Sequence, residues 1–237
     1  MIETAILLAA GEGSRLRPAA AYKPLCPVAG RPLIDHALGG LAEAGIKRVV
    51  VVLGYGADTI AAHLAARSWP IAVETVAVDN YRRPNGVSVL AAERAIDGGE
   101  AVLAMCDHLV DPRLYRLLAA AGAGAGAGSG ARLGIDRLID NDWVDMDDVT
   151  RVATEGDRIV AIGKGLESYD CFDTGVFAIG PALFAALRHL ESPSLTEGMR
   201  ILARDGGAFA IDIGDLQWID VDDPPALDKA EQWLATA

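Results

Sequence analysis

The chain has 237 residues, 51% of them hydrophobic, and a formal net charge of −12. Its length and hydrophobic content exclude a disordered chain and allow a large buried core. The acidic charge argues against nucleic-acid binding, which needs an excess of Lys and Arg, and no apolar run reaches the roughly 18 residues of a transmembrane helix.

Short apolar runs alternate with helical patterns over the first half of the chain. Strands are expected at residues 4–9, 48–53, 71–76 and 101–105, and helices at residues 32–44, 57–66, 86–95 and 112–121. Because these strands are almost continuously apolar, we expect them to be buried on both faces, as in a parallel sheet covered by helices.

A low-complexity run, residues 121–130 (AGAGAGAGSG), separates this half from the rest and is typical of a flexible surface loop. Short β-like runs are expected between residues 132 and 179, including 157–162 and 172–179. The remaining expected elements are helices at 181–190 and 194–204, strands at 208–213 and 216–221, and a closing helix at 224–237.

A glycine-rich turn follows the first strand, where residues 8–17 read LAAGEGSRLR. Its small residues, which let the backbone approach a ligand, are Ala9, Ala10, Gly11 and Gly13. Backbone amides in such a turn can cradle phosphate oxygens, and the guanidinium groups of Arg15 and Arg17 suit phosphate as well. The turn lacks the Gly-Lys-Ser/Thr of a Walker loop and the third glycine of a dinucleotide fingerprint, so both of those sites are disfavoured. Taken alone, it is equally well interpreted as a tight turn with surface arginines.

Lys23 follows in a segment that Pro24 and Pro27 stiffen, where its ammonium suits a polyphosphate. The series L-A-A-G-x-G-S-R-L-R-P, K-P-L and G-R-P-L-I resembles the sugar-phosphate nucleotidyltransferase superfamily. The resemblance implies an α/β fold, a Rossmann-like sandwich with a mostly parallel central sheet flanked by helices, plus a small β-rich acceptor-binding elaboration. It implies one domain, 1–237, with a nucleotide-binding half (1–120) and an acceptor-binding half (131–237) around the Gly/Ala loop 121–130.

The activity implied by the resemblance is transfer of a nucleoside monophosphate from an NTP to a phosphorylated small molecule, with release of pyrophosphate. Gly11 and Gly13 would contact the nucleotide, and Arg15 would bind its β- and γ-phosphates. Lys23 would lie against the α-phosphate and stabilise the charge that builds up as pyrophosphate leaves.

Two aspartates are expected to bind Mg²⁺. Asp107 follows the strand 101–105, and the carboxyl end of a parallel strand faces the ligand crevice. The resemblance implies that Asp107 binds the metal together with a second carboxylate from late in the chain, and Asp220 in the run WIDVDD is chosen for that role. Two carboxylates with phosphate oxygens are sufficient for Mg²⁺.

Neighbouring polar residues have simpler interpretations. Asp222 and Asp223 precede Pro224 and are typical of a helix N-terminus, with Asp223 favoured as the cap. His108 has no companion ligands that would indicate a zinc site.

Asn85, Gly86 and Ser88 stand at a loop-to-helix junction, where free amides and a hydroxyl could contact the base or ribose of the nucleotide. A turn that starts the helix is the alternative. The resemblance favours nucleotide contact.

Segments in the second half of the chain resemble one particular family within this superfamily. Residues 162–164 (IGK), 169–177 (YDCFDTGVF) and 218–222 (WIDVD), with Asp107-His108, resemble the CTP:inositol-1-phosphate cytidylyltransferases. This implies CTP and a phosphorylated polyol as substrates, inositol 1-phosphate giving CDP-inositol. The chain departs from the resemblance at 121–130 and in the acidic region 140–148.

The acceptor contacts implied are Lys164, Asp173, Thr174, Gly175 and Glu197. Lys164 would pair with the acceptor phosphate, and the others would hydrogen-bond ring hydroxyls. Two alternatives stay open: Lys164 as an exposed strand-end lysine, and Glu197 as part of the capping box Ser194-x-x-Glu197.

Other functions are weighed against this one. A hexose 1-phosphate could be the acceptor, whereas phosphocholine would want an aromatic cage, for which the four Phe, four Trp and five Tyr residues show no clustered set. A non-catalytic nucleotide sensor is disfavoured by the complete set Lys23, Asp107 and Asp220.

The cellular setting is the last expectation. The chain opens without a secretory signal, and Cys26, Cys106 and Cys171 are widely spaced and odd in number, so we expect reduced thiols and a cytoplasmic location. In the resembled family this domain often precedes a membrane-embedded alcohol phosphatidyltransferase. We therefore expect a functional link to such an enzyme. Because no apolar run is long enough, we expect no membrane segment in this chain.

Overall fold

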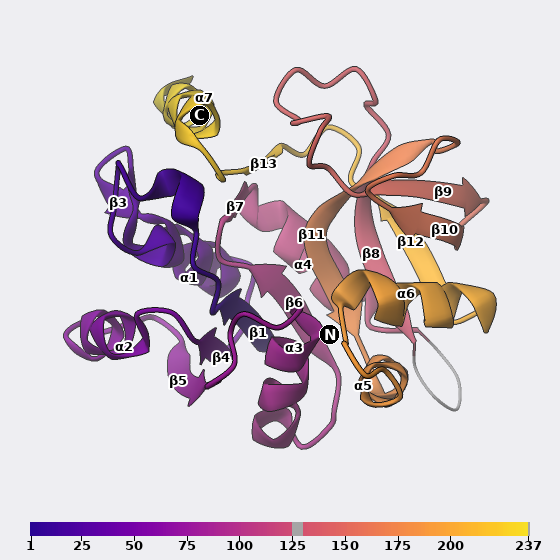
Figure 1. Ribbon diagram of the computed structural model, residues 1–237, viewed down its shortest axis with the longest axis horizontal. Helices are drawn as coiled ribbons and strands as arrows, with labels where there is room; N and C mark the ends of the chain where they lie inside the picture. The colour runs from indigo at the N-terminus through magenta and orange to yellow at the C-terminus, as the bar shows by residue number, and fades with distance from the viewer. Residues whose placement is uncertain (125–129, 237) are drawn as a thin grey trace.

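A computed structural model describes residues 1–124 and 130–236 of the chain. Its centre is a sheet of nine strands (Figure 1). In spatial order these are β5 (Ala72–Ala77), β4 (Arg48–Leu53), β1 (Thr4–Ala9), β6 (Ala101–Met105), β11 (Cys171–Ile179), β8 (Ala131–Asp136), β12 (Ala208–Asp212), β10 (Arg158–Gly163) and β9 (Arg151–Glu155).

Strand direction differs between the two halves of the sheet. The first four strands in spatial order are parallel, as the sequence predicts. In the other half, β11 runs antiparallel to β6 and β8, β12 is parallel to β8, and β9 and β10 are antiparallel neighbours. The sequence predicts a mostly parallel sheet, whereas the observed sheet is mixed, with its parallel pairs confined to β5, β4, β1 and β6 and to β8 with β12. For β9 and β10 the reason is that only a short turn joins them, and a short connection requires an antiparallel pair.

The described residues form seven α-helices. They are α1 (Leu33–Glu43), α2 (Ala57–Ala65), α3 (Gly86–Ala92), α4 (Pro112–Ala121), α5 (Pro181–Arg188), α6 (Leu195–Arg204) and α7 (Pro224–Thr236). Three 3₁₀ turns accompany them: η1 (Ser14–Leu16), η2 (Lys23–Leu25) and η3 (Glu93–Ile96).

The core has one layer on each face of the sheet. Because side chains alternate along a strand, Ala5 and Leu7 of β1 point to one face, and Ile6 and Leu8 to the other. The first face is covered by α1, α2 and α4, and the second by α3, α5 and α6 (Figure 1). This is the helix-flanked sandwich that the sequence predicts.

Two small strand pairs lie outside the main sheet. β2 (Pro27–Val28) pairs with β3 (Arg31–Pro32), and β7 (His108–Val110) pairs antiparallel with β13 (Trp218–Asp220). In the second pair, Asp220 lies opposite His108. The strand that carries Asp220 is thereby held beside the strand that begins immediately after Asp107. The last helix, α7, packs against the small strands β2 and β13 and not on the main sheet.

Two sequence expectations are limited by the extent of the described chain. The Gly/Ala loop 121–130 includes residues 125–129, which lie outside the described residues. Within residues 1–124 and 130–236, none of the helices combines the length and the apolar character that crossing a bilayer requires.

Candidate active site

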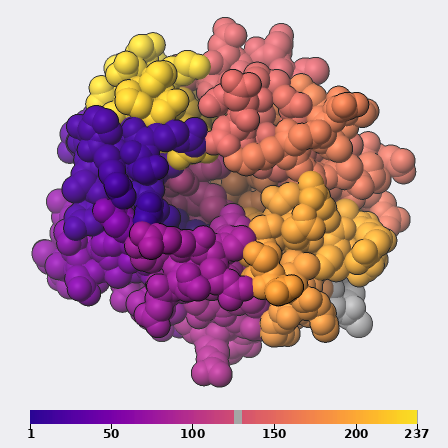
Figure 2. Space-filling view, in the orientation of Figure 1, coloured from indigo at the N-terminus to yellow at the C-terminus, as the bar shows by residue number. Residues whose placement is uncertain are grey.

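A cavity of about 560 Å³ opens between the two halves of the sheet. Figure 2 shows the hollow between the N-terminal segments and the later ones. Its polar lining includes Asn85, Asp107, His108, Asp145, Asp148, Lys164, Asp173, Asp220 and Asp222. A smaller pocket of about 120 Å³, beneath the glycine-rich turn, shares Asp107 and Asp222 with it and is also lined by Ala9, Gly11, Gly13 and Lys23.

The glycine-rich turn is shaped by the approach of Lys23. Gly13 has a left-handed backbone (φ 54°), and a Cβ atom added there would lie 2.3 Å from Cβ of Lys23. Gly11 has open space where its Cβ would be, so its backbone faces the smaller pocket without obstruction. Ala10 is buried, and its carbonyl oxygen accepts a hydrogen bond from the amide of Tyr55 (2.9 Å).

Lys23 is only 6% exposed, and its ammonium group is met by carboxylates. It lies 2.7 Å from Oδ2 of Asp107 and 3.7 Å from Oδ1 of Asp220, and it also pairs with Asp222. A buried ammonium needs such partners because its desolvation is costly. The two sequence-predicted metal ligands and the predicted catalytic lysine are thus brought together.

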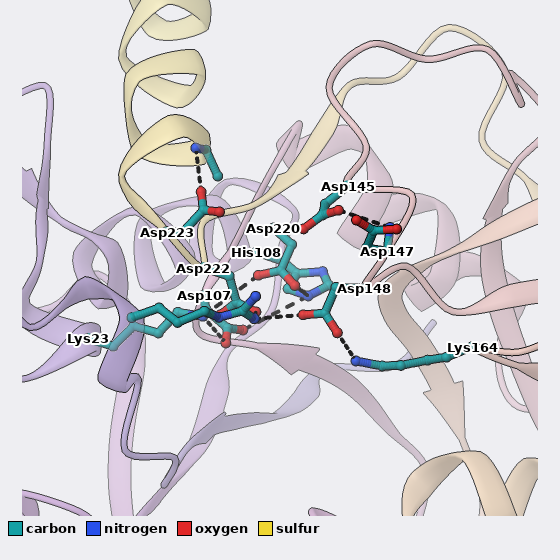
Figure 3. A network of polar contacts seen from close by, with 12 residues as sticks. Lys23, Asp107, His108, Asp145, Asp147, Asp148, Lys164, Asp220, Asp222 and Asp223 are labelled. Atoms are coloured by element: carbon teal, nitrogen blue, oxygen red, sulfur yellow. Dashed lines mark hydrogen bonds and ion pairs between the residues drawn. The ribbon is translucent and has the colours of Figure 1, made fainter.

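His108 completes this cluster (Figure 3). Its Nδ1 donates to the carbonyl oxygen of Thr174 (2.8 Å), which leaves Nε2 facing Asp220 at 3.5 Å and Asp107 at 4.0 Å. Burial alone would lower the pKa of His108, but the charge of Asp220 and then that of Asp107 outweigh it and raise the pKa to about 9. Burial also acts to raise the pKa of Asp107, yet the charges of Lys23 and His108 hold it below its usual value.

The donor set fits a divalent cation. Asp107 and Asp220 each offer a carboxylate oxygen, and His108 offers a ring nitrogen once its imidazole has released a proton; these three atoms lie within 4.8 Å of one another. Oδ1 of Asp220 is buried and has no hydrogen-bond partner among the described residues. A buried carboxylate oxygen without a donor is uncommon and is the kind of atom that a bound cation satisfies.

Asp222 takes a different position from the one expected. It pairs with both Lys23 and Arg15 instead of capping the last helix. Asp223 is the cap, since its Oδ1 accepts from the amide of Ala226 at 2.8 Å. The sequence alone does not distinguish these adjacent aspartates. In the structure Asp223 lies at the start of α7, whereas Asp222 contacts the cations of the site.

Asp148 is a second site residue that sequence reasoning did not single out. It lies 2.6 Å from the guanidinium of Arg15. It also pairs with Lys164 (Figure 3). The only signal in the sequence was the unusual acidity of the region 140–148.

The expected nucleotide contacts at the start of α3 have packing roles. Oδ1 of Asn85 accepts from the amide of Leu195 (2.8 Å), and a Cβ added at Gly86 would lie 2.6 Å from the carbonyl oxygen of Pro193. Ser88 is 7% exposed. The junction thus holds α3 against the start of α6, and Asn85 alone of the three lines the cavity.

The expected acceptor contacts divide into two groups. Lys164, Asp173 and Gly175 line the cavity, whereas Glu197 does not; it pairs with Arg200 on its own helix. The hydroxyl of Ser194 accepts from the amide of Glu197 (3.1 Å), as the capping-box alternative requires.

The backbone next to Asp173 is already engaged. The Thr174 hydroxyl donates to the carbonyl oxygen of Gly134, and the Gly175 amide donates to Asp173 (2.8 and 2.7 Å). A Cβ at Gly175 would lie 2.3 Å from Nδ1 of His108, so this glycine makes room for the imidazole. Asp173 is the group left to meet a ligand, and burial raises its pKa to about 6.

Comparison with known proteins identifies related sequences. The MobA-like NTP transferase domain matches residues 5–204. The bifunctional IPC transferase and DIPP synthase of Rubrobacter xylanophilus is 36% identical over 236 residues, which cover 97% of this chain and 51% of the relative. The protein with the same name from Aquifex aeolicus is 32% identical, with 99% and 52% covered. The chain thus spans about half the length of these curated relatives.

Solved structures share the fold. The inositol-1-phosphate CTP transferase from T. maritima superposes with a TM-score of 0.87 at 23% identity, covering 99% of this chain and 95% of that one. UTP-bound UGPase from Acinetobacter baumannii gives a TM-score of 0.76 at 18% identity, with 99% and 93% covered. At these identities the likeness concerns the arrangement of the chain.

Proposed function

The chain belongs to the family of the MobA-like NTP transferase domain, and from this premise we propose that it transfers CMP from CTP to inositol 1-phosphate, giving CDP-inositol and pyrophosphate. The observation that carries the proposal is the position of Lys23, which lies where the pocket under the glycine-rich turn meets the large cavity and contacts Asp107 and Asp220 there. The choice of CTP and inositol 1-phosphate is supported by the names of the relatives and of the solved structure.

The reaction needs little covalent help from the protein. An oxygen of the acceptor phosphate attacks the α-phosphorus of CTP, and the bond from that phosphorus to the bridging oxygen breaks, so pyrophosphate leaves. A phosphate monoester is already largely dianionic at neutral pH, because its second pKa is about 6, and no general base is required. Catalysis therefore consists of positioning and charge neutralisation.

The residues divide this work between the two pockets. Lys23 would neutralise charge on the α-phosphate, and Arg15 would hold the β- and γ-phosphates against the amides of the glycine-rich turn. Lys164, which lines the large cavity, would bind the acceptor phosphate. Asp107 and Asp220 would hold Mg²⁺, which when bound supplies positive charge to the phosphate oxygens.

The lining of the cavity supports a polyhydroxylated acceptor. Near Lys164 the cavity presents the carboxylates of Asp145 and Asp173, which accept hydrogen bonds from hydroxyls. The cavity surface also includes three aromatic rings, so the clustered aromatics not apparent in the sequence do exist. Phe177 and Trp218 are 1% and 5% exposed, however, which leaves Trp143 as the one of these three with an accessible face.

Phosphocholine is the second candidate acceptor, because an acidic cavity with one accessible indole could hold a cationic head group. A hexose 1-phosphate would satisfy the same carboxylates as inositol. These alternatives concern the acceptor and leave the reaction class unchanged.

The proposal extends to the setting of the reaction. Cys26, Cys106 and Cys171 are buried and unpaired, in keeping with a reducing cytoplasm. A functional link to a membrane-embedded alcohol phosphatidyltransferase, which would consume a CDP-alcohol, is supported by the greater length and the bifunctional names of the relatives.

A pyrophosphate-release assay tests the proposal by crossing the four NTPs with inositol 1-phosphate, glucose 1-phosphate, mannose 1-phosphate and phosphocholine. We expect turnover with CTP and inositol 1-phosphate, and a loss of about 10²–10³ in Lys23→Ala. Lys47→Ala is the matched control, since Lys47 is exposed and pairs with Glu3 outside the cavity. A preference for a purine NTP would overturn the cytidylyl assignment, and normal turnover in Lys23→Ala would overturn the site.

A further inference from the structure

Charged side chains of alternating sign form a continuous series from the large cavity to the smaller pocket beneath the glycine-rich turn. In order they are Lys164, Asp148, Arg15, Asp222, Lys23 and Asp107, each paired with the next. Three of them, Arg15, Lys23 and Lys164, are the cations that the proposed reaction assigns to substrate phosphates. In the structure their donors are engaged by carboxylates of the chain itself.

Asp148 is the member of this series that contacts both Arg15 and Lys164. It belongs to the segment 137–150, which connects β8 to β9, and it bridges Arg15 on the nucleotide side to Lys164 on the acceptor side. The guanidinium of Arg15 lies 2.6 Å from Oδ2, while Lys164 contacts Oδ1. Each carboxylate oxygen therefore holds one cation.

The segment around Asp148 is held by its own backbone. The amides of Asp148 and Val149 donate to the carbonyl oxygen of Asp145 (3.2 and 2.9 Å), and Arg151 donates to the carbonyl oxygen of Met146 (3.2 Å). These bonds form a turn that presents the Asp148 carboxylate to the cavity without needing either cation. The bridge to Arg15 and Lys164 is thus not required to build the turn.

We propose that Asp148 is a positioning residue whose carboxylate occupies, between Arg15 and Lys164, the place that substrate phosphates take, so that it competes with both substrates and sets their affinity. This inference rests on the proposed function in one respect, namely that the cavity binds phosphate groups. It adds a residue outside the glycine-rich turn and the metal cluster to the determinants of substrate binding.

The exposure of the three side chains makes the exchange feasible. The side chains of Arg15 and Lys164 are 50% and 61% exposed, and that of Asp148 is 29% exposed. Ion pairs this open to solvent are weak, about 0.2–1 kcal/mol each, and are easily replaced. A phosphate offers the same cations oxygen acceptors and more negative charge, so it would displace the carboxylate while the cations stay near their present positions.

Asp148→Asn tests the inference by removing the competing charge with little change in shape. We measure binding of inorganic pyrophosphate and, separately, of inositol 1-phosphate by titration calorimetry, together with KM and kcat for CTP and inositol 1-phosphate. We expect both affinities to rise about three- to tenfold, both KM values to fall in parallel, and kcat to change less than about twofold. The differences should shrink at high salt, because partly exposed charges are screened.

Asp147→Asn is the matched control, with the same change of charge in the same segment. Asp147 is exposed, and its carboxylate makes no ion pair among the described residues, so we expect unchanged affinities. A lower melting temperature in Asp148→Asn with unchanged affinities would make the bridge purely structural and would overturn the inference.

Two further outcomes would also overturn it. If Asp148→Asn weakened binding of inositol 1-phosphate alone, Asp148 would be a contact of the ring hydroxyls. If neither the wild type nor Asp148→Asn bound pyrophosphate or inositol 1-phosphate, Arg15 and Lys164 would not be phosphate-binding cations. The function itself stands or falls on wild-type turnover, which is measured independently of the Asp148→Asn comparison.

Discussion

Gly13 shows how one residue without a side chain can determine the position of a charged one. Its left-handed backbone turns the chain so that the stem of Lys23 passes where a Cβ atom would be. Gly11, two residues earlier, has open space around the same position. The two glycines of the turn therefore have different physical roles, one in packing and one in leaving room at the smaller pocket.

Substitution by alanine should separate these roles. Gly13→Ala should lower the free energy of unfolding by about 1–2 kcal/mol for the left-handed backbone alone, and should reduce turnover by displacing Lys23. Gly11→Ala should leave the melting temperature nearly unchanged and raise KM for the NTP. Thermal unfolding and initial rates check both variants, and equal destabilisation by the two would contradict this division.

Asp173 is a group whose ionisation costs stability. Burial raises its pKa from about 3.8 to about 6, so the folded state keeps a proton that the unfolded state has already released. Stability therefore falls as the pH rises from about 4 to about 6, and the loss persists above that range. A carboxyl group kept at such a cost is typical of a functional site.

Asp173→Asn should remove this cost. We expect a higher melting temperature than wild type above pH 6, little difference below about pH 4, and lower turnover if Asp173 holds the acceptor. Thermal unfolding across this pH range is the measurement. A variant less stable than wild type at pH 7 would show that the charged form is favoured instead.

At the scale of single residues, the sequence predicts those site residues that belong to a local sequence motif. Lys23 and Asp107 follow recognisable patterns, and the structure brings both of them to Asp220. Asp148 and Asp222 were missed because their partner Arg15 is 133 and 207 residues away along the chain. No local spacing relates residues that only the completed sheet brings together.

Among the elements, α6 shows how an acidic residue can be explained by its helix. The Ser194 hydroxyl caps the start of the helix by accepting a hydrogen bond from the amide of Glu197. The Glu197 carboxylate pairs with Arg200, one turn further along the helix. Both contacts stabilise the helix, and neither faces the cavity. The first turn of this helix therefore gives no support to an acceptor role for Glu197.

Two variants distinguish the helix role from the acceptor role. Ser194→Ala should cost about 1 kcal/mol of stability through loss of the cap, with KM for the acceptor unchanged. Glu197→Gln should leave both KM values within about twofold of wild type, because it removes only an exposed ion pair. A selective rise in KM for the acceptor in Glu197→Gln would restore the acceptor assignment.

Element prediction succeeded where burial alone sets the pattern. β1, β4 and β6 are continuous apolar runs buried on both faces, and their bounds were predicted from the sequence. β7 has only three residues and was missed, because its pairing with β13 depends on a segment more than one hundred residues later. Strand direction in the second half of the sheet could not be predicted either, because the burial pattern of a single strand does not determine whether it pairs parallel or antiparallel.

In the molecule as a whole, the net charge of −12 coexists with a cavity that we propose binds phosphate groups. The placed cations lie beside an excess of carboxylates, which repel one another wherever a cation does not intervene. Asp107, Asp220 and Asp222 share the single ammonium of Lys23. A divalent ion beside them should therefore stabilise the whole fold and not only assist turnover.

Addition of Mg²⁺ without nucleotide should raise the melting temperature of the wild type in a concentration-dependent way. Asp220→Asn should lose most of this shift, because it removes the charge of the carboxylate whose buried Oδ1 accepts no hydrogen bond from the described residues. Asp223→Asn is the control, since asparagine caps a helix as well as aspartate does. An equal shift in both variants would place the ion elsewhere.

The strand pair β7–β13 has a consequence for the order in which the chain is made. When the glycine-rich turn, Lys23 and Asp107 have left the ribosome, β7 has no strand to pair with until residue 218 follows. Asp220 arrives with that strand. During synthesis, the carboxylate that we propose as the second metal ligand therefore joins Asp107 only after more than one hundred further residues have been added.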